Sequence, residues 1–271
     1  MNRIGSKFAA LRQKGEKGLI AYITAGDPDF SSTREIVLRL EEAGVDLIEL
    51  GIPFSDPTAD GPVIQAASGR ALAGGATPAG VISLVKSIRA ESEIPLILFS
   101  YYNPIFCYGC REFAGDAAGA GADGLLVVDL PPEESRELRQ FTDPLGMDFI
   151  SLIAPTTGPA RARKILGSAS GFAYYIAVTA VTGTTRPDPE SVRKDISRLR
   201  RISPVPVVAG FGISTPQDAA GIAAHADGIV VGSALVGIVE KNSRRKDLAL
   251  QVASFAREIG GAIRTPPSVR G

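Results

Sequence analysis

Residues 46–62 read Asp46-Leu47-Ile48-Glu49-Leu50-Gly51-Ile52-Pro53-Phe54-Ser55-Asp56-Pro57-Thr58-Ala59-Asp60-Gly61-Pro62. The first five residues form a short aliphatic run, which is typical of a strand buried within a parallel sheet. The residues that follow are rich in Pro and predict a stiff loop, and Pro62 is well placed to open a helix. Because Glu49 is the next-to-last residue of the run, the strand is predicted to carry a carboxyl group towards that loop.

The same order, a short aliphatic run followed by a longer segment with helical spacing, recurs along the whole chain. Eight strands are predicted, at residues 19–24, 46–50, 95–100, 124–130, 148–153, 172–178, 205–210 and 227–231. Helices are predicted at 6–14, 31–43, 62–73, 77–89, 111–120, 132–141, 159–166, 189–202, 215–223 and 234–259. Eight such units, with an N-terminal helix and an extra helix in the second unit, predict a (β/α)8 TIM barrel of the α/β class.

A doubly wound open sheet is the alternative arrangement of the same units. The eight runs are about equally apolar, so none has the polar character of an edge strand, and no Gly-x-Gly-x-x-Gly follows the first run. Both observations favour the barrel. With 271 residues and 45% apolar residues, we expect one barrel domain over 1–271, with a disordered tail at 264–271.

The composition argues against several classes of partner. Lys+Arg and Asp+Glu both number 29, so no field of one sign is available to hold nucleic acid or an anionic membrane. The longest apolar stretch has about 12 residues, against the roughly 20 that span a bilayer. Cys107, Cys110 and the single histidine, His225, are too few for a typical zinc site, and two reduced thiols are expected rather than a redox pair. We therefore expect a cytoplasmic protein with a small-molecule substrate and no metal.

Carboxylates are the leading candidates for chemistry. In an α/β barrel the reactive groups lie at the carboxyl ends of the strands, where alternation would point Glu49 into the barrel mouth. Burial there would raise its pKa and suit it to proton transfer, although a structural carboxylate bonded to backbone amides fits the position equally well. Asp56 and Asp60 follow on the Pro-rich loop, where ordinary turn chemistry is the alternative to a catalytic role.

Small-residue loops follow the sixth, seventh and eighth predicted strands, at Thr182-Gly183, Phe211-Gly212 and Gly232-Ser233. Backbone amides at such loops, with a helix N-terminus behind them, can bind a phosphate group without Lys or Arg. Three loops on adjacent strands favour a phosphate monoester as ligand, and tight βα turns are the alternative explanation.

Other residue types are placed less favourably for catalysis. No lysine falls in a predicted strand, which argues against Schiff-base chemistry, and His225 falls at the end opposite the catalytic loops. Tyr174 and Tyr175 are adjacent on one predicted strand, so only one of them can face the barrel interior.

Seven segments together resemble the tryptophan synthase alpha chain family over essentially the whole length. They are residues 21–28, 49–62, Tyr101-Tyr102-Asn103-Pro104-Ile105, 129–134, Val181-Thr182-Gly183, Gly210-Phe211-Gly212-Ile213 and Val231-Gly232-Ser233-Ala234. The resemblance implies cleavage of indole-3-glycerol phosphate to indole and D-glyceraldehyde 3-phosphate, in L-tryptophan biosynthesis, without a metal or organic cofactor. It assigns Glu49 the acid–base steps and Asp60 the stabilisation of the indole nitrogen.

The resemblance also implies the remaining contacts. Tyr174 would be the active-site tyrosine, and the phosphate would lie among Thr182, Gly183, Phe211, Gly212, Gly232 and Ser233. A pyridoxal-phosphate-dependent beta chain would bind at Pro53, Phe54 and Asp56 and form an alpha2-beta2 complex. Two other functions stay open. One is another phosphate-binding barrel enzyme, such as a sugar-phosphate isomerase or a thiamine-phosphate-type synthase, and the other is a mainly allosteric subunit.

Overall fold

The computed structural model describes residues 2–176, 189–210 and 212–264. Its strands are β1 (Gly18–Thr24), β2 (Leu47–Gly51), β3 (Leu96–Ser100), β4 (Gly124–Val127), β5 (Asp148–Phe149), β6 (Ser151–Ile153), β7 (Ala173–Ile176), β8 (Val207–Gly210) and β9 (Gly228–Val231). Every pairing between them is parallel, in the order β5-β4-β3-β2-β1-β9-β8-β7-β6.

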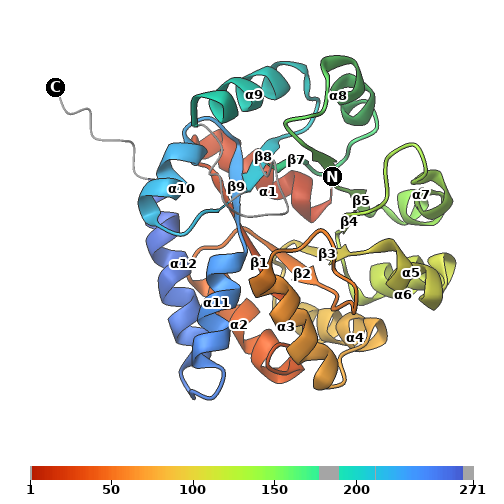
Figure 1. The fold of residues 1–271 in the computed structure, drawn as a ribbon, viewed down its shortest axis with the longest axis vertical. Coiled ribbons are helices and arrows are strands. Elements are labelled where there is room, and N and C mark those ends of the chain that lie inside the picture. The colour runs from red at the N-terminus through yellow and green to blue at the C-terminus, as the bar shows by residue number, and fades with distance from the viewer. Residues whose placement is uncertain (1, 177–188, 211, 265–271) are drawn as a thin grey trace.

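The two ends of this order belong to one stretch of chain. β5 and β6 are the halves of the predicted fifth strand, separated only by Ile150, whose N–H donates to the carbonyl of Leu125 at 2.9 Å. Since β5 pairs with β4 and β6 pairs with β7, the sheet closes on itself. The predicted barrel is confirmed and the open sheet is excluded, and Figure 1 shows the helices surrounding the strands.

The helices follow the predicted order with three differences. They are α1 (Arg3–Lys14), α2 (Phe30–Glu42), α3 (Pro62–Ala73), α4 (Pro78–Arg89), α5 (Tyr102–Tyr108), α6 (Cys110–Ala120), α7 (Arg136–Thr142), η1 (Asp143–Leu145), α8 (Pro159–Leu166), α9 (Pro189–Ile202), α10 (Pro216–Ala223), α11 (Ser233–Asn242) and α12 (Leu248–Arg264). α5 was not predicted. α7 begins four residues later than expected, after a turn in which Ser135 N–H donates to the Pro131 carbonyl.

The predicted closing helix is divided into α11 and α12, because the polar residues between them form a turn. Arg245 N–H donates to the Asn242 carbonyl at 2.8 Å, and the Arg245 guanidinium pairs with Asp247. Of the predicted disordered tail, Arg264 is the last residue of α12 and residues 265–271 lie outside the described part of the chain.

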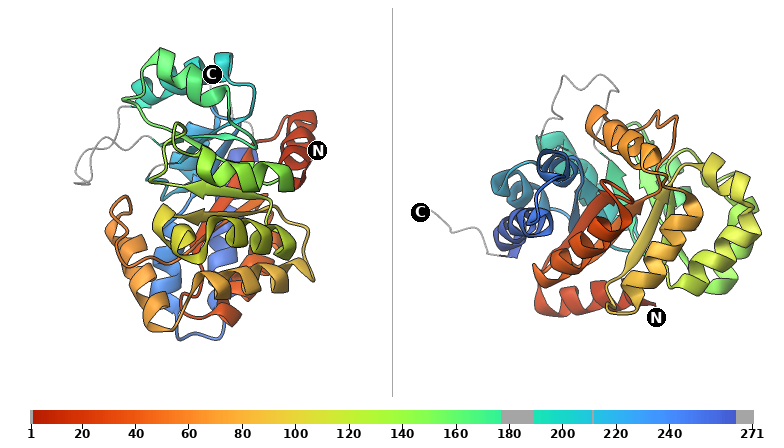
Figure 2. Two further views of the ribbon diagram at one scale, coloured as in Figure 1. Left: turned by 90° about the vertical axis from the view of Figure 1, so that its right-hand side faces the viewer. Right: turned by 90° about the horizontal axis from the view of Figure 1, so that it is seen from below.

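Alternation along each strand separates two cores. Ile20, Leu47, Ile97 and Val208 belong to a cluster inside the barrel, whereas their neighbours along the strands pack against the outer helices. α1 closes the end of the barrel opposite the carboxyl ends of the strands, called here the lower end (Figure 2). Its Phe8 ring lies 5.7 Å from that of Phe172.

Glycines at the lower end of the barrel make room for α1. A Cβ on Gly124 would lie 3.1 Å from Ile4 of α1, and one on Gly18 would lie 3.3 Å from Phe8. The bottom layer of the barrel is therefore filled by helix side chains instead of strand side chains.

Three aspartates join neighbouring strands at this lower end, and we call them the aspartate clamps: Asp46, Asp123 and Asp227. Each donates its N–H to a carbonyl of the adjacent strand and accepts, through its carboxylate, the N–H of the same residue. The partners are Leu19, Leu96 and Val207, at 2.8 Å for the first bond and 2.9 Å for the second in every case. Each carboxylate also pairs with an arginine: Arg264, Arg89 and Arg200 respectively.

Among the described residues, no single helix is long and apolar enough to cross a membrane, and α3 and α4 meet the criterion only as a pair bent by 94°.

Candidate active site

Glu49 lies inside the barrel on β2, between Tyr22 of β1 and Ile97 of β3 in register. Its side chain is 0% exposed, and neither carboxyl oxygen has a hydrogen-bond partner among the described residues. This excludes the alternative of a carboxylate bonded to backbone amides within that part of the chain. Because burial disfavours the charged form, the pKa of Glu49 is raised to about 8. Near neutral pH the group is mostly protonated and can donate a proton.

Asp60 lies on the loop of residues 52–61, just before α3, and is half-buried. Burial raises its pKa to about 6, and a hydrogen bond from the Tyr101 hydroxyl opposes that rise. The same hydroxyl accepts the N–H of Ala59 at 2.9 Å. Near neutral pH Asp60 is therefore mostly ionised while Glu49 is mostly protonated. Two carboxyl groups with separated pKa values are the arrangement that acid–base catalysis requires.

Of the two adjacent tyrosines on β7, one lines the barrel beside these carboxyl groups. Tyr174 belongs to the interior cluster, whereas Tyr175 lies on the helix side, where its hydroxyl donates to Asp195 at 2.8 Å. The expectation that only one of the pair faces inward is confirmed, and that one is Tyr174. Burial is the main cause that raises its pKa, and the charge of Glu49 is the next, so its hydroxyl remains a proton donor.

Glycines at the strand ends leave room for both interior tyrosines. A Cβ on Gly210 would lie 2.4 Å from the Tyr174 hydroxyl oxygen, and one on Gly51 would lie 2.2 Å from that of Tyr22. Either position would displace a buried ring if it carried a side chain. The two glycines therefore fix how far the hydroxyls reach towards the mouth of the barrel.

The predicted phosphate loops are described only in part. Gly232 caps the N-terminus of α11 and Ser233 is the first residue of that helix, while Gly212, two residues after the end of β8, has a φ of 52°. Thr182, Gly183 and Phe211 lie outside the described residues. A Cβ on Gly232 would lie 3.5 Å from Tyr22, so this helix start faces the same end of the barrel as the carboxyl groups.

The predicted partner-contact residues lie on the loop that carries Asp60. Asp56 is exposed, Phe54 is half-buried and Pro53 is buried within this chain. The Phe54 ring packs on that of Tyr101, with centroids 5.3 Å apart. Of the three, Asp56 and the outer part of Phe54 are accessible to a partner.

Two further tyrosines lie at the site and were not predicted from the sequence. Tyr22 is the register neighbour of Glu49, and its ring meets that of Phe99 edge to face at 5.1 Å. Tyr101 follows β3 directly, and its hydroxyl accepts the N–H of Ala59 on the 52–61 loop. Tyr22 could have been predicted from the sequence, because alternation along its strand points it into the barrel. For Tyr101 no spacing signal exists, since it lies past the strand end.

Metal-ligating side chains, lysines and the single histidine were the other residue types considered for the site. No group of three or more His, Cys, Asp or Glu side chains that could hold a metal ion occurs in the described part of the chain. None of the eight lysines lies in a described strand, and His225 precedes β9 at the end of the barrel closed by α1, both as predicted.

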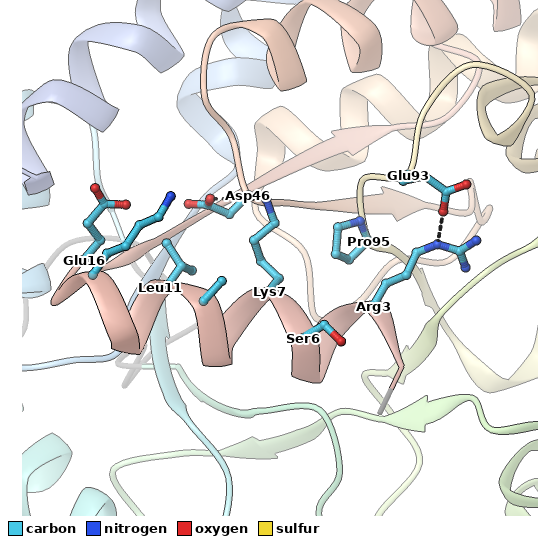
Figure 3. Close-up of a pocket in the computed structure, with 10 residues that line it drawn as sticks. Arg3, Ser6, Lys7, Leu11, Glu16, Asp46, Glu93 and Pro95 are labelled. Carbon is cyan, nitrogen blue, oxygen red and sulfur yellow. Dashed lines mark hydrogen bonds and ion pairs between the residues drawn. The ribbon is translucent and has the colours of Figure 1, made fainter.

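Two hollows flank α1, at the end of the barrel away from these carboxyl groups. One of about 340 Å³ is lined by Arg3, Lys7, Asp46 and Glu93 among others (Figure 3), and the second, of about 440 Å³, lies on the other side of the helix. In the first, Arg3 pairs with Glu93 and Lys7 lies 3.7 Å from Asp46. Because these charges pair with one another, we interpret the first hollow as a packing gap between α1 and the barrel.

Comparison with known proteins gives one consistent family. The family model described as "Tryptophan synthase alpha chain" matches residues 8–263. The tryptophan synthase alpha chain of Citrifermentans bemidjiense is 48% identical over 263 residues, 97% of this chain and 96% of the relative, and that of Carboxydothermus hydrogenoformans is 49% identical over 255 residues, 93% and 96%.

Solved structures agree with this assignment. Tryptophan synthase subunit alpha from Legionella pneumophila superposes with a TM-score of 0.90 at 38% identity, covering 97% of this chain and 98% of that one. A chain of tryptophan synthase from M. tuberculosis, in its aminoacrylate-bound form, gives 0.87 at 30% identity, covering 97% and 100%. On this evidence the chain belongs to the tryptophan synthase alpha chain family, the lyases of tryptophan biosynthesis.

Proposed function

We propose that Glu49 and Asp60 cleave indole-3-glycerol phosphate to indole and D-glyceraldehyde 3-phosphate by acid–base retro-aldol chemistry. The observation that carries the proposal is the buried Glu49 carboxyl group, without a hydrogen-bond partner among the described residues and mostly protonated, next to a loop that presents an ionised Asp60. The first can give a proton, and the second can accept a hydrogen bond from a group that becomes positive.

The two carboxyl groups divide the reaction between them. Glu49 donates its proton to C3 of the indole ring, and Asp60 accepts a hydrogen bond from N1–H and stabilises the positive charge that develops there. The Glu49 carboxylate then takes the proton of the adjacent glycerol hydroxyl. The aldehyde forms as the carbon–carbon bond breaks, and the bonding electrons return to the ring. Glu49 ends the cycle protonated, as it began.

The other predicted residues hold the substrate. Tyr174 would offer its hydroxyl beside Glu49, and the phosphate group would bind Thr182, Gly183, Phe211, Gly212, Gly232 and Ser233. Support comes from the α11 N-terminus, where Gly232 provides no side-chain cap, because the N–H groups and dipole of a helix N-terminus attract an anion. The glycerol phosphate end of the substrate would then lie towards β8 and β9, and the indole ring towards the 52–61 loop.

A beta chain is the proposed partner, in an alpha2-beta2 complex that docks on Pro53, Phe54 and Asp56. The exposure of Asp56 supports this docking face. Pyridoxal phosphate would belong to the partner alone, and this chain would need no cofactor for its own reaction. We place the protein in the cytoplasm, where Cys107 and Cys110, both free thiols, would stay reduced.

The pH dependence of the reaction follows from the two carboxyl groups. Below about pH 6 Asp60 is protonated and cannot accept the N1–H bond, and above about pH 8 Glu49 has lost the proton that C3 needs. We expect kcat/KM for indole release to follow a bell-shaped curve with limbs near these values. Asp60→Asn should remove the acidic limb along with most of the activity. A rate that is flat from pH 5 to 9 would contradict the assignment.

The glycine at the end of β8 offers a second test. Gly210→Ala should displace the Tyr174 ring, because the new methyl group would lie 2.4 Å from its hydroxyl oxygen. We expect kcat to fall on the order of 10- to 100-fold, the usual effect of moving a substrate-positioning group by about 1 Å. Gly221→Ala is the matched control, because a Cβ there has no neighbour within 4 Å. Equal rates for the two variants would exclude a role for the position of Tyr174.

An indole-release assay, run with and without a beta chain, tests the proposal as a whole. Release of indole and D-glyceraldehyde 3-phosphate by the isolated chain, stimulated by the partner, is the expected result. Binding of a sugar phosphate without indole release would favour another phosphate-binding barrel enzyme. An inert chain that raises only the turnover of the partner would favour the allosteric subunit.

A further inference from the structure

We propose that the second hollow beside α1, of about 440 Å³, binds a small phosphate ester that carries hydroxyl groups. The hollow lies between the C-terminal ends of α1 and α9 and the segment that enters β8. Its volume falls within the range of small-molecule sites, roughly 300 to 1,000 Å³. Because it lies at the lower end of the barrel, away from Glu49 and Asp60, the site is separate from the one proposed for the substrate and does not depend on the proposed function.

Cationic side chains outnumber carboxylates in this hollow. Its lining includes the cations Arg12, Lys17 and Arg200 and the carboxylates Glu16 and Asp227. Arg200 and Asp227 neutralise each other, since the guanidinium donates to Asp227 Oδ1 at 2.7 Å and to Oδ2 at 3.3 Å. Oδ2 also accepts the N–H of the first residue of β8 at 2.9 Å. Two cations and one carboxylate are left.

Lys17 is the most enclosed of the three cations. It is half-buried, and its Nζ donates to the carbonyl of Ala226 at 2.7 Å. Among the described residues, no carboxylate lies within ion-pair distance of Lys17 or Arg12. Burial, followed by the charge of Arg200, lowers the pKa of Lys17. An anion in the hollow would oppose both effects, because it favours the charged ammonium group.

The remaining carboxylate, Glu16, is shared between the two hollows beside α1. It lines the first as well as the second, and the first also contains Lys14. With Glu16 counted in both, the first hollow has three cations and three carboxylates, whereas the second has three cations and two carboxylates. The second hollow therefore keeps an excess of positive charge even when Glu16 is assigned to it in full.

The ends of two helices bring backbone carbonyl groups to the same hollow. Gly15, the C-cap of α1, and Ser203, the residue after α9, both line it. The last carbonyl oxygens of a helix have no partner within the helix and carry the negative end of its dipole. They accept hydrogen bonds but repel a bare anion. A ligand that fits this hollow therefore combines negative charge with hydroxyl groups.

Phosphate is the charged group that matches these cations best. A phosphate ester carries between one and two negative charges near neutral pH, and Arg12 and Lys17 both lack a carboxylate at ion-pair distance. Its three terminal oxygens can accept hydrogen bonds from an ammonium and a guanidinium group at once. The hydroxyl groups of the ester would then donate to the carbonyl oxygens at the helix ends.

A ligand in this site would fasten α1 to the barrel. Arg12 belongs to α1 and Arg200 belongs to α9, so one ligand would contact both helices. Because it binds only when α1 is docked, it stabilises the docked state. We expect the backbone amides of α1 to exchange hydrogen more slowly when the ligand is present, whereas those of α3, which does not line the hollow, should be unaffected.

Glycerol 3-phosphate is the probe, titrated into the full chain at constant ionic strength and followed by the NMR shifts of the backbone amides. The amides of Gly15, Lys17 and Val205 report on the hollow, and those of Gly232 and Ser233 report on the opposite end of the barrel. We expect saturable shifts at the first three amides, which give a Kd for the hollow. Glycerol or sodium chloride in place of the probe should give no such shifts.

Arg12→Glu tests the role of the cations. Arg12 is exposed, so its replacement should leave the fold intact. We expect the Kd for the hollow to rise at least about tenfold, since a charge-assisted hydrogen bond is lost and a repulsive charge is added. Lys14→Glu is the matched control, because it makes the same change of charge on the same helix at an exposed residue that lines only the first hollow. Its Kd should stay close to the wild-type value.

Two results would overturn the inference. Absence of saturable shifts at Gly15, Lys17 and Val205 would show that the hollow binds no phosphate ester, whatever happens at Gly232 and Ser233. Equal weakening in the two variants would show that the probe responds to the net charge of the chain instead of to this hollow. Neither result depends on the release of indole, so the proposed function is tested separately.

Discussion

Glu49→Gln is expected to lower the rate of indole release by at least about three orders of magnitude, with substrate binding retained. The amide has nearly the shape of the carboxyl group but can neither give a proton to C3 nor remove one from the hydroxyl. Single-turnover rates and a separate binding measurement check the two parts of this statement. Glu35→Gln, at an exposed position on α2, is the control. Near-wild-type turnover in Glu49→Gln would show that Glu49 does not transfer protons in the reaction.

The same substitution should make the protein more stable at neutral pH. Glu49 has a pKa of about 8 in the folded chain against an ordinary value of 4.5, so the folded state binds one more proton between these values. Wild-type stability therefore falls as the pH rises through that window, by up to about 1.4 kcal/mol per pH unit, whereas the amide of the variant does not titrate and has no such dependence. The free energy of unfolding in urea should be measured for both proteins at pH 5 and pH 8. Between these pH values, the difference between variant and wild type should change by a few kcal/mol in favour of the variant.

Asp123→Ala should destabilise the fold by roughly 3 to 5 kcal/mol. This clamp residue is 5% exposed, accepts the N–H of Leu96 and pairs with Arg89 and Arg3. Its removal leaves a buried N–H without a partner, and it leaves Arg89, whose side chain is 12% exposed, without its carboxylate. The free energy of unfolding in urea measures the loss.

A neighbouring carboxylate supplies the comparison for this variant. Glu93 also pairs with Arg3, but its side chain is 78% exposed, so water screens the pair. We expect Glu93→Ala to leave the free energy of unfolding almost unchanged. If Asp123→Ala were as mild as Glu93→Ala, the clamps would contribute little to stability.

Local patterns predicted most of the barrel, because each βα unit buries its own apolar face and carries its own start and stop signals. Pro62, Pro159 and Pro189 are the first residues of α3, α8 and α9, at the positions that the sequence indicated. Three features were not predicted: α5, the turn between α11 and α12, and the division of the fifth strand at Ile150. α5 depends on a contact with Asp129, which lies 27 residues away from Tyr102.

For the candidate site, strand phase was a reliable guide to burial. Alternation placed Glu49 and one of the two tyrosines in the interior, since those positions follow directly from the pleat. It could not predict that Glu49 lacks a partner in the described chain or that the Tyr101 hydroxyl accepts the N–H of Ala59, because both depend on how a loop folds back over the barrel. The phosphate assignments stay predictions, since Thr182, Gly183 and Phe211 are not described.

The position of α1 has a consequence for synthesis on the ribosome. This helix is translated first, yet its Phe8 packs on Phe172, and Lys17 just after it bonds to the carbonyl of Ala226, 209 residues further along the chain. Its binding surface does not exist until the last strands have emerged. The first helix to leave the ribosome must therefore wait, with its apolar face uncovered, to become one of the last parts of the barrel to dock.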